Sequence, residues 1–218
     1  MISTEKNFVF IHVPRTGGGS LRTWLSQWAD PMDRALLSRV LGHLPIRSKW
    51  RAASVRTHEP AALLRRRLGA QAFDRMETFA VVRNPYDHAL SYHLFMQQGS
   101  AQHRKDRFGA MSFEEGLRYR LRQLKPHDQA HMVADRKGRV LVKRLLKFES
   151  LLSDISDLQA SLDLPVEPIG HLNKTHRADY QSQYSPQAKA LVERLYARDF
   201  DLFPYDFDTG LPCHHGAA

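Results

Sequence analysis

The fold of this chain is decided by the stretch Phe8-Val9-Phe10-Ile11-His12-Val13-Pro14-Arg15-Thr16-Gly17-Gly18-Gly19-Ser20. Four apolar residues at its start predict a short buried strand, and apolar residues recur after it at helical spacing, at Leu21, Trp24, Leu25 and Trp28. Between the two, three glycines let main-chain N–H groups approach an anion closely, and the start of the helix adds partial positive charge. The stretch therefore predicts a strand, loop and helix that bind a phosphorylated ligand.

This loop differs from the loop of nucleotide triphosphatases. That loop, GxxxxGK[ST], has a lysine directly before its Ser or Thr, whereas Gly19 precedes Ser20 here. The cation instead stands before the glycines, at Arg15. A small-molecule or nucleotide kinase would also require Mg²⁺, and it is the first alternative function. The position of Arg15 before the glycines, with Gly19 in place of the lysine, argues against a kinase.

A second candidate anion site follows the apolar run 78–82. Arg83 stands at the end of that predicted strand, and Ser91 comes eight residues later on a predicted helix. A guanidinium fork and a hydroxyl can together hold a terminal phosphate, with a geometry that a lysine does not reproduce. The alternative is a purely structural role for Arg83, as a bridge inside the protein.

Both motifs resemble those of sulfotransferases that use 3′-phosphoadenosine 5′-phosphosulfate (PAPS). The loop is similar to their 5′-phosphosulfate loop, H-x-P-[KR]-T-G-G-x-S-L, and residues 83–92 are similar to their 3′-phosphate motif, R-[DN]-P-x-x-R-x-x-S-x-Y. His88 departs from the second pattern, in which an arginine is common, and Arg15 stands where most members carry lysine. The resemblance extends over residues 8–207, with further matching positions at Gln129, 147–149, 173–174 and 196–200.

The resemblance implies that a sulfuryl group passes in line from PAPS to a hydroxyl of a carbohydrate or glycolipid. PAPS would be bound by Arg15, Thr16, Gly17, Gly18, Gly19, Ser20, Leu21, Arg83, Ser91 and Lys174. Arg15 would also stabilise the negative charge that develops on the leaving oxygen. His58 resembles the catalytic base of the 2-O-sulfotransferase branch, and the neighbouring Glu59 is the alternative base. Gln129 would line the acceptor cleft.

The predicted elements alternate between strands and helices. Strands are expected at residues 7–13, 78–82 and 140–148, and helices at residues 19–28, 61–68, 86–98, 111–124, 150–162 and 186–198. This alternation predicts an α/β, P-loop-like, three-layer fold, with a central parallel sheet flanked by helices and ligands at the carboxyl ends of the strands. No linker or repeat divides the 218 residues, so we expect one domain over residues 1–210 and a disordered tail at 211–218.

Charge and composition limit the partners. A formal net charge of +9 suits a polyanion, but no recognisable nucleic-acid reader is present, so a non-catalytic phosphate- or nucleic-acid-binding module is only the second alternative. The single cysteine, Cys213, and the lack of a signal peptide or an 18-residue apolar run predict a cytoplasmic protein, which would meet membranes only through a lipid-linked acceptor. His127 and His131 have no companion ligand, so no metal is expected.

Overall fold

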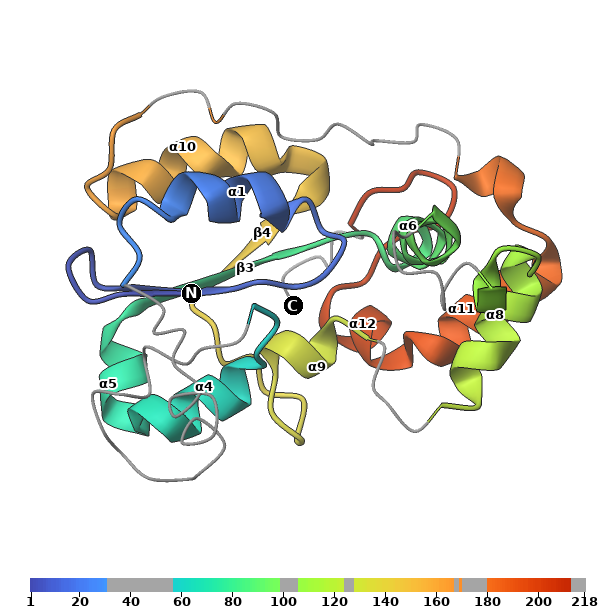
Figure 1. Ribbon diagram of the computed structural model, residues 1–218, viewed down its shortest axis with the longest axis horizontal. Coiled ribbons are helices and arrows are strands. Elements are labelled where there is room, and N and C mark those ends of the chain that lie inside the picture. Colours follow the sequence, from blue (N-terminus) through green and yellow to red (C-terminus); the bar gives the residue numbers. More distant parts are fainter. Residues whose placement is uncertain (31–56, 99–105, 124–127, 167–168, 170–179, 213–218) are drawn as a thin grey trace, which may run out of the picture. The chain divides into compact units, whose positions relative to one another are not determined.

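The computed structural model describes residues 1–30, 57–98, 106–123, 128–166, 169 and 180–212. The chain divides into two compact units, of which unit 1 comprises Met1–Val82 and Met132–Lys174, and unit 2 comprises Arg83–His131 and Thr175–Ala218. Their elements are drawn in Figure 1. Each unit combines two separate stretches of the chain, and the expectation of one domain stays a prediction. The extended piece expected at 53–57 and most of the predicted tail lie outside the described residues.

Unit 1 is built on a four-stranded sheet in the order β1-β2-β3-β4. The strands β2 (Phe8–Ile11), β3 (Glu77–Val82) and β4 (Arg144–Lys147) are parallel, and β1 (Ile2–Ser3) pairs antiparallel with β2. β2 and β3 are buried almost throughout, as expected for parallel strands that are covered on both faces. The predicted parallel sheet is therefore confirmed. The strand β1 was not predicted, because two residues show no alternation.

Helices cover both faces of this sheet, as Figure 1 shows. One face carries α1 (Gly18–Leu25) and α10 (Leu151–Ser161), and the other carries α4 (Ala61–Leu68) and α5 (Ala70–Arg75). Between the sheet and the first pair of helices lies a buried apolar cluster that includes Phe8, Phe10, Phe79, Leu21, Leu25, Ile155 and Leu158. This cluster joins β2 firmly to α1, so it holds the two ends of the intervening loop.

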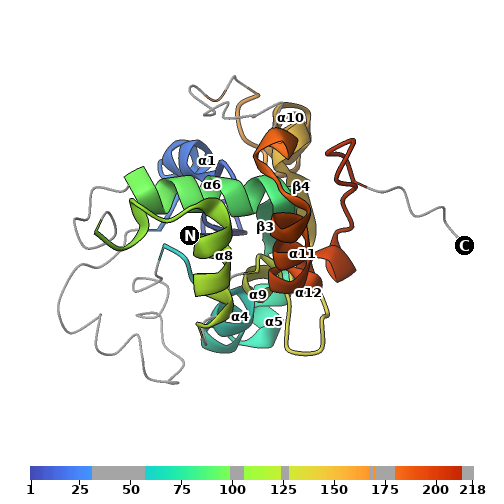
Figure 2. The same ribbon diagram turned by 90° about the vertical axis from the view of Figure 1, so that its right-hand side faces the viewer.

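Unit 2 is helical in its described part. It contains α6 (Pro85–Gln98), α8 (Phe113–Leu121), α11 (Pro186–Leu195) and α12 (Ala197–Leu202), and the first three pack on one another (Figure 2). The described chain also contains the short α9 (Ala130–Val133) and the 3₁₀ turns η1 (Phe148–Ser150) and η2 (Gln181–Gln183). Within the described residues, no helix is long and apolar enough to span a membrane.

Several helices and strands begin or end at other residues than predicted. The helix expected at 111–124 begins at Phe113, because Ser112 and Glu115 form a reciprocal capping box before it. The strand expected at 140–148 is shorter, since Val140 forms a separate antiparallel bridge with Ala134. The helix expected at 186–198 is two helices that meet at Tyr196, whose main chain leaves the helical region at φ −113° and ψ 24°. No glycine or proline marks that break in the sequence.

Candidate active site

The loop between β2 and α1 has an unusual main chain. Arg15 and Gly17 are both left-handed, with φ of 65° and 74°. Between them, Thr16 is buried, and its Oγ1 donates a hydrogen bond of 3.0 Å to the Val13 carbonyl. Left-handed residues in a tight loop turn neighbouring N–H groups toward one side, which makes a concave site for anions. A non-glycine residue rarely adopts this conformation, so Arg15 indicates a loop whose shape serves a purpose beyond connection.

The three glycines of the loop have different surroundings. A Cβ atom at Gly17 would lie 2.6 Å from Cε2 of Phe148, and a Cβ atom at Gly18 would lie 2.8 Å from Cδ2 of His12. At Gly19, no atom of the described residues, apart from its chain neighbours and the main chain of its own helix, lies within 4 Å of the position that a Cβ would take. Packing inside unit 1 therefore requires the first two glycines, whereas Gly19 is not required by contacts with other described residues.

His58 lies beside this loop, with its ring centroid 4.6 Å from that of His12. Its Nδ1 is 2.9 Å from the main-chain oxygen of His12. A carbonyl oxygen only accepts hydrogen bonds, so Nδ1 must carry the hydrogen and Nε2 of the neutral ring keeps its lone pair. The residue is exposed to solvent. In its neutral form, an imidazole held by a hydrogen bond at Nδ1 is suited to remove a proton through Nε2.

His12 cannot serve in the same way. Its ring stacks on Phe10 at 5.7 Å, and its Nδ1 is buried without a hydrogen-bond partner. Burial, together with the smaller electrostatic effects of the nearby His58 and Arg22, lowers the pKa of His12 to about 3. His12 is therefore neutral at physiological pH, and its ring packs against the ring of His58.

The alternative base, Glu59, is engaged elsewhere. It is 3% exposed, and its carboxylate accepts a hydrogen bond from the guanidinium of Arg67 on α4, which is also buried. Breaking a buried ion pair leaves an uncompensated charge, so this pair holds residue 59 in place. Glu59 thus anchors the segment that contains His58.

In unit 2, Arg83 is paired with a carboxylate. The residue follows β3 directly and is 2% exposed. Its Nε and Nη2 lie 2.7 and 2.5 Å from Oδ2 of Asp87, which lies four residues later, in the first turn of α6. Ser91, the other residue predicted to hold a phosphate here, is buried on the same helix. Asp87 was overlooked from the sequence, although the spacing of four residues is typical of helical ion pairs.

Gln129 does not line an open cleft, contrary to expectation. The residue is 1% exposed, and its side-chain amide is hydrogen-bonded to both the main-chain N–H and the main-chain oxygen of Arg83. It also contacts Asp199, which is fully buried. Burial raises the pKa of Asp199 to about 7, although hydrogen bonds from the main-chain N–H groups of Ala130 and Gln129 oppose the shift. Gln129 and residues 196–200 match positions of the family, but the sequence alone did not indicate that Gln129 and Asp199 are in contact.

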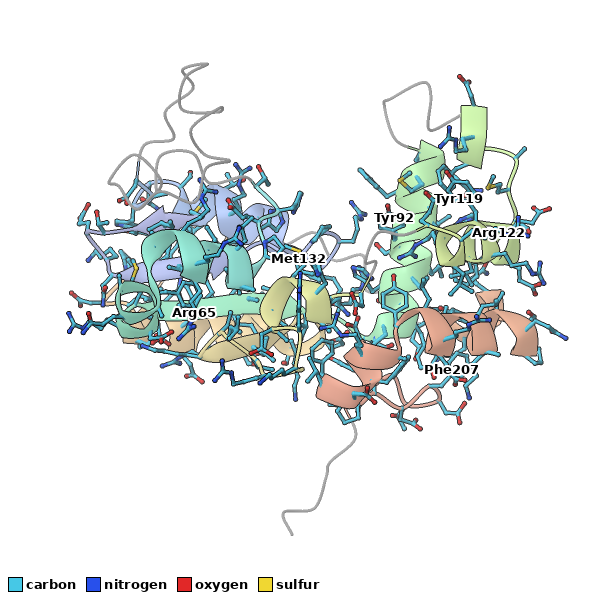
Figure 3. All side chains as sticks on the ribbon, turned by 90° about the horizontal axis from the view of Figure 1, so that it is seen from below. Arg65, Tyr92, Tyr119, Arg122, Met132 and Phe207 are labelled. Atoms are coloured by element: carbon cyan, nitrogen blue, oxygen red, sulfur yellow. The ribbon has the colours of Figure 1, made fainter. Side chains whose placement is uncertain are left out.

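The histidine at position 88 has an arginine close by. His88 Nδ1 lies 3.0 Å from the phenol oxygen of Tyr196, and Nη2 of Arg120 lies 2.8 Å from the same oxygen. Arg120 donates to the phenol oxygen of Tyr196, and the tautomer of His88 decides which partner donates in the bond between Tyr196 and His88. The Arg120 guanidinium also lies over the ring of Tyr92, 4.3 Å from its centroid; Tyr92 is labelled in Figure 3. A guanidinium from α8 thus stands near the position where the family motif usually has one.

The predicted site residues therefore fall into two groups. Unit 1 brings the residues of the loop together with His58 and Glu59, and unit 2 holds Arg83 and Ser91 on and before α6. Lys174 lies outside the described residues. In the part of the chain that the structure describes, no three His, Cys, Asp or Glu side chains are grouped to hold a metal ion.

Comparison with known proteins identifies the family. A family model described as "Sulfotransferase family" matches residues 1–206. The crystal structure of a sulfotransferase from Alicyclobacillus acidocaldarius has a similar fold, with a TM-score of 0.51 and 16% sequence identity over 94% of this chain and 98% of that chain. No curated protein sequence is significantly similar. The structural match confirms the P-loop-like α/β fold, and the family match covers nearly the whole chain. This chain belongs to the sulfotransferase family and is a transferase enzyme.

Proposed function

We propose that this sulfotransferase moves the sulfuryl group of PAPS to a hydroxyl of a carbohydrate or glycolipid acceptor. The observation that carries the proposal is the arrangement around His58 in unit 1. The imidazole of His58, with Nδ1 within hydrogen-bond distance of the His12 main-chain oxygen, lies beside a loop that has left-handed residues and, among the described residues, open space at Gly19. A base and an anion-binding loop in one unit are what transfer of an anionic group to a hydroxyl requires.

The chemistry assigned to these groups is an in-line displacement at sulfur. The acceptor oxygen forms a bond to sulfur while the bond from sulfur to the bridging oxygen breaks, and that oxygen leaves with the electron pair on adenosine 3′,5′-bisphosphate. His58 Nε2 takes the proton of the acceptor hydroxyl, a role worth roughly 10²–10⁴-fold in rate. Arg15 and the N–H groups of the loop stabilise the charge on the leaving oxygen.

The PAPS donor is supported by the two sequence motifs. We assign the 5′-phosphosulfate to residues 15–21, and the 3′-phosphate to Arg83 and Ser91, with Lys174 as an additional cation. The ion pair between Arg83 and Asp87 orients the guanidinium, but it also fits a purely structural Arg83. Recognition of the 3′-phosphate and a purely structural role of Arg83 are distinguished by comparing ligands with and without the 3′-phosphate.

The first test is calorimetric titration of the whole chain with adenosine 3′,5′-bisphosphate in EDTA, beside AMP and ATP. We expect binding that requires the 3′-phosphate and no metal, with a dissociation constant on the order of micromolar. Binding of ATP alone, and only with Mg²⁺, would favour a kinase. Salt-dependent retention on DNA with no response to any nucleotide would favour a binding module without catalysis.

A second test addresses the acceptor. The protein is incubated with PAPS and a panel of oligosaccharides, glycolipids, simple phenols and amines, and sulfated products are identified by mass spectrometry. We expect an increase of one sulfuryl group on a carbohydrate hydroxyl. Sulfation of phenols or amines alone would contradict the carbohydrate acceptor while leaving the sulfuryl transfer intact.

A further inference from the structure

Gln129 holds the main chain of Arg83 as a neighbouring strand would. The N–H of Arg83 donates to Oε1 of Gln129 at 2.8 Å, and Nε2 of Gln129 donates to the carbonyl of Arg83 at 2.7 Å. The ladder between β3 and β4 ends at Val82, so the sheet does not provide these two bonds. One side-chain amide therefore fixes the residue that follows the strand.

Asp199 fixes the amide in turn. Its Oδ2 accepts hydrogen bonds from the main-chain N–H and the Nε2 of Gln129, at 3.0 and 3.1 Å, and its Oδ1 accepts one from the N–H of Ala130 at 2.7 Å. With the amide reversed, its NH₂ group would face the Arg83 N–H and its oxygen would face the Arg83 carbonyl oxygen, so both hydrogen bonds to the Arg83 main chain would be lost. The network permits a single orientation of Gln129.

Connecting the segments of Arg83, Gln129 and Asp199 through buried polar groups is energetically demanding. The Gln129 side chain is 1% exposed and Asp199 is 0% exposed, and burying an amide and a carboxyl group requires that their hydrogen bonds be satisfied. Apolar side chains would join the same segments without that requirement. A satisfied polar network instead defines one geometry, and the main chain that it defines here is that of Arg83.

We propose that Gln129 and Asp199 are positioning residues that fix the main chain of Arg83, so that its guanidinium, oriented by Asp87, meets the 3′-phosphate of the nucleotide. The proposal rests on the proposed function, in which Arg83 recognises that phosphate. Neither residue is assigned a contact with the ligand. Each acts through Arg83.

The test compares Gln129→Glu with the wild type by calorimetry, using adenosine 3′,5′-bisphosphate and AMP. This substitution would place a carboxylate against Asp199 and the Arg83 carbonyl. We expect the ratio of the two affinities to fall about tenfold, while AMP affinity is unchanged. The matched control is Gln97→Glu, since Gln97 Nε2 also donates to a main-chain oxygen in unit 2, that of Met111 at 3.0 Å. In the control, the ratio should stay at the wild-type value.

Arg83→Lys separates failure of this proposal from failure of the proposed function. If Arg83→Lys leaves the ratio unchanged, Arg83 does not recognise the 3′-phosphate, and both proposals are wrong. If Arg83→Lys lowers the ratio and Gln129→Glu does not, only the positioning role is wrong. Equal losses in Gln129→Glu and Gln97→Glu would also overturn it, because they would reflect general damage to unit 2.

Two further measurements apply if Gln129→Glu does not fold. Asp199→Asn keeps an oxygen for Ala130 but turns an NH₂ group toward the two Gln129 donors, so it should lower the ratio in the same direction. In the wild type, hydrogen exchange at the Arg83 amide should be as slow as in the core strands. Rapid exchange at that amide would show that the main chain is not fixed, and it would overturn the proposal.

Discussion

The two candidate anion sites of this sulfotransferase are built in different ways. In unit 1, the site is a short continuous loop whose shape comes from main-chain conformation, with left-handed residues at Arg15 and Gly17. In unit 2, the candidate site consists of the side chains of Arg83 and Ser91. Arg83 is bonded to Asp87 through its side chain and to Gln129 through its main chain, and Gln129 is bonded to Asp199.

The difference determines how each site can be damaged. A main-chain site depends on small residues, since an added methyl group either strains the loop or fills the space of the ligand. A side-chain site depends on polar partners, because a removed partner leaves a buried charge or donor unsatisfied. Substitutions should therefore separate ligand binding from stability in unit 1 and combine them in unit 2.

The largest expected effect is on turnover and concerns His58. His58→Ala should lower kcat by roughly 10²–10⁴-fold with unchanged affinity for adenosine 3′,5′-bisphosphate, because it removes the proposed base and leaves the loop intact. Steady-state kinetics with PAPS and calorimetry measure the two quantities, and His131→Ala, in unit 2, is the control. Full turnover in His58→Ala together with its loss in Glu59→Gln would identify Glu59 as the base.

Next in size is the stability lost when the buried pair in unit 2 is broken. Arg83→Ala leaves the Asp87 carboxylate without its guanidinium, which should lower the free energy of unfolding by about 3–5 kcal/mol. It should also weaken binding of adenosine 3′,5′-bisphosphate by about 1.5–3 kcal/mol at a temperature where the variant is folded. Urea unfolding and calorimetry give the two values. A loss of stability alone would show that Arg83 is only a structural bridge.

Within unit 1, the glycines should behave differently from one another. Gly17→Ala should lower the free energy of unfolding by about 2–3 kcal/mol, because φ is 74° and the new methyl group meets Phe148. Gly19→Ala has open space, so we expect no loss of stability but roughly tenfold weaker nucleotide binding. Thermal unfolding and titration of both variants test this. Tight nucleotide binding in Gly19→Ala would mean that the ligand does not approach this glycine.

The same contrast explains what could be predicted from the sequence. The strand, the loop and the helix of unit 1 are neighbours in the chain, so the glycines, Arg15 and the apolar spacing could be interpreted together. Arg83 and Ser91 belong to one short motif and were predicted for the same reason. Both α/β class and parallel order followed from the alternation of elements, and the structure confirms them.

The residues that sequence analysis missed are partners from distant parts of the chain. Gln129 was expected in an acceptor cleft, and Asp199 was assigned no role, because their contacts with each other and with Arg83 exist only in the folded chain. Arg120 near His88 is a similar case. The break between α11 and α12 at Tyr196 was also missed, because no glycine or proline is present there. Patterns of neighbouring residues predicted the local structure. They did not predict polar contacts between residues that are far apart in the chain.

The smallest expected effect is on the pH dependence of stability, and it has opposite signs in the two units. In unit 2, burial raises the pKa of Asp199 to about 7, above its usual value of about 3.9, so the folded state holds the extra proton between these values. Stability from this group is therefore lost as the pH rises toward 7. In unit 1, burial lowers the pKa of His12 to about 3, so the unfolded state binds the extra proton below about 6.5, and stability is lost as the pH falls.

Urea unfolding between about pH 4 and pH 8 separates these two contributions. Asp199→Asn cannot titrate, so its free energy of unfolding should decline less than that of the wild type as the pH rises, whatever its stability at one pH. His12→Gln should instead decline less on acidification. The slope is the measured quantity, because both substitutions also change the absolute stability. Curves parallel to the wild type in both variants would mean that neither buried group titrates differently in the folded state, and the contrast between the units would then be limited to their geometry.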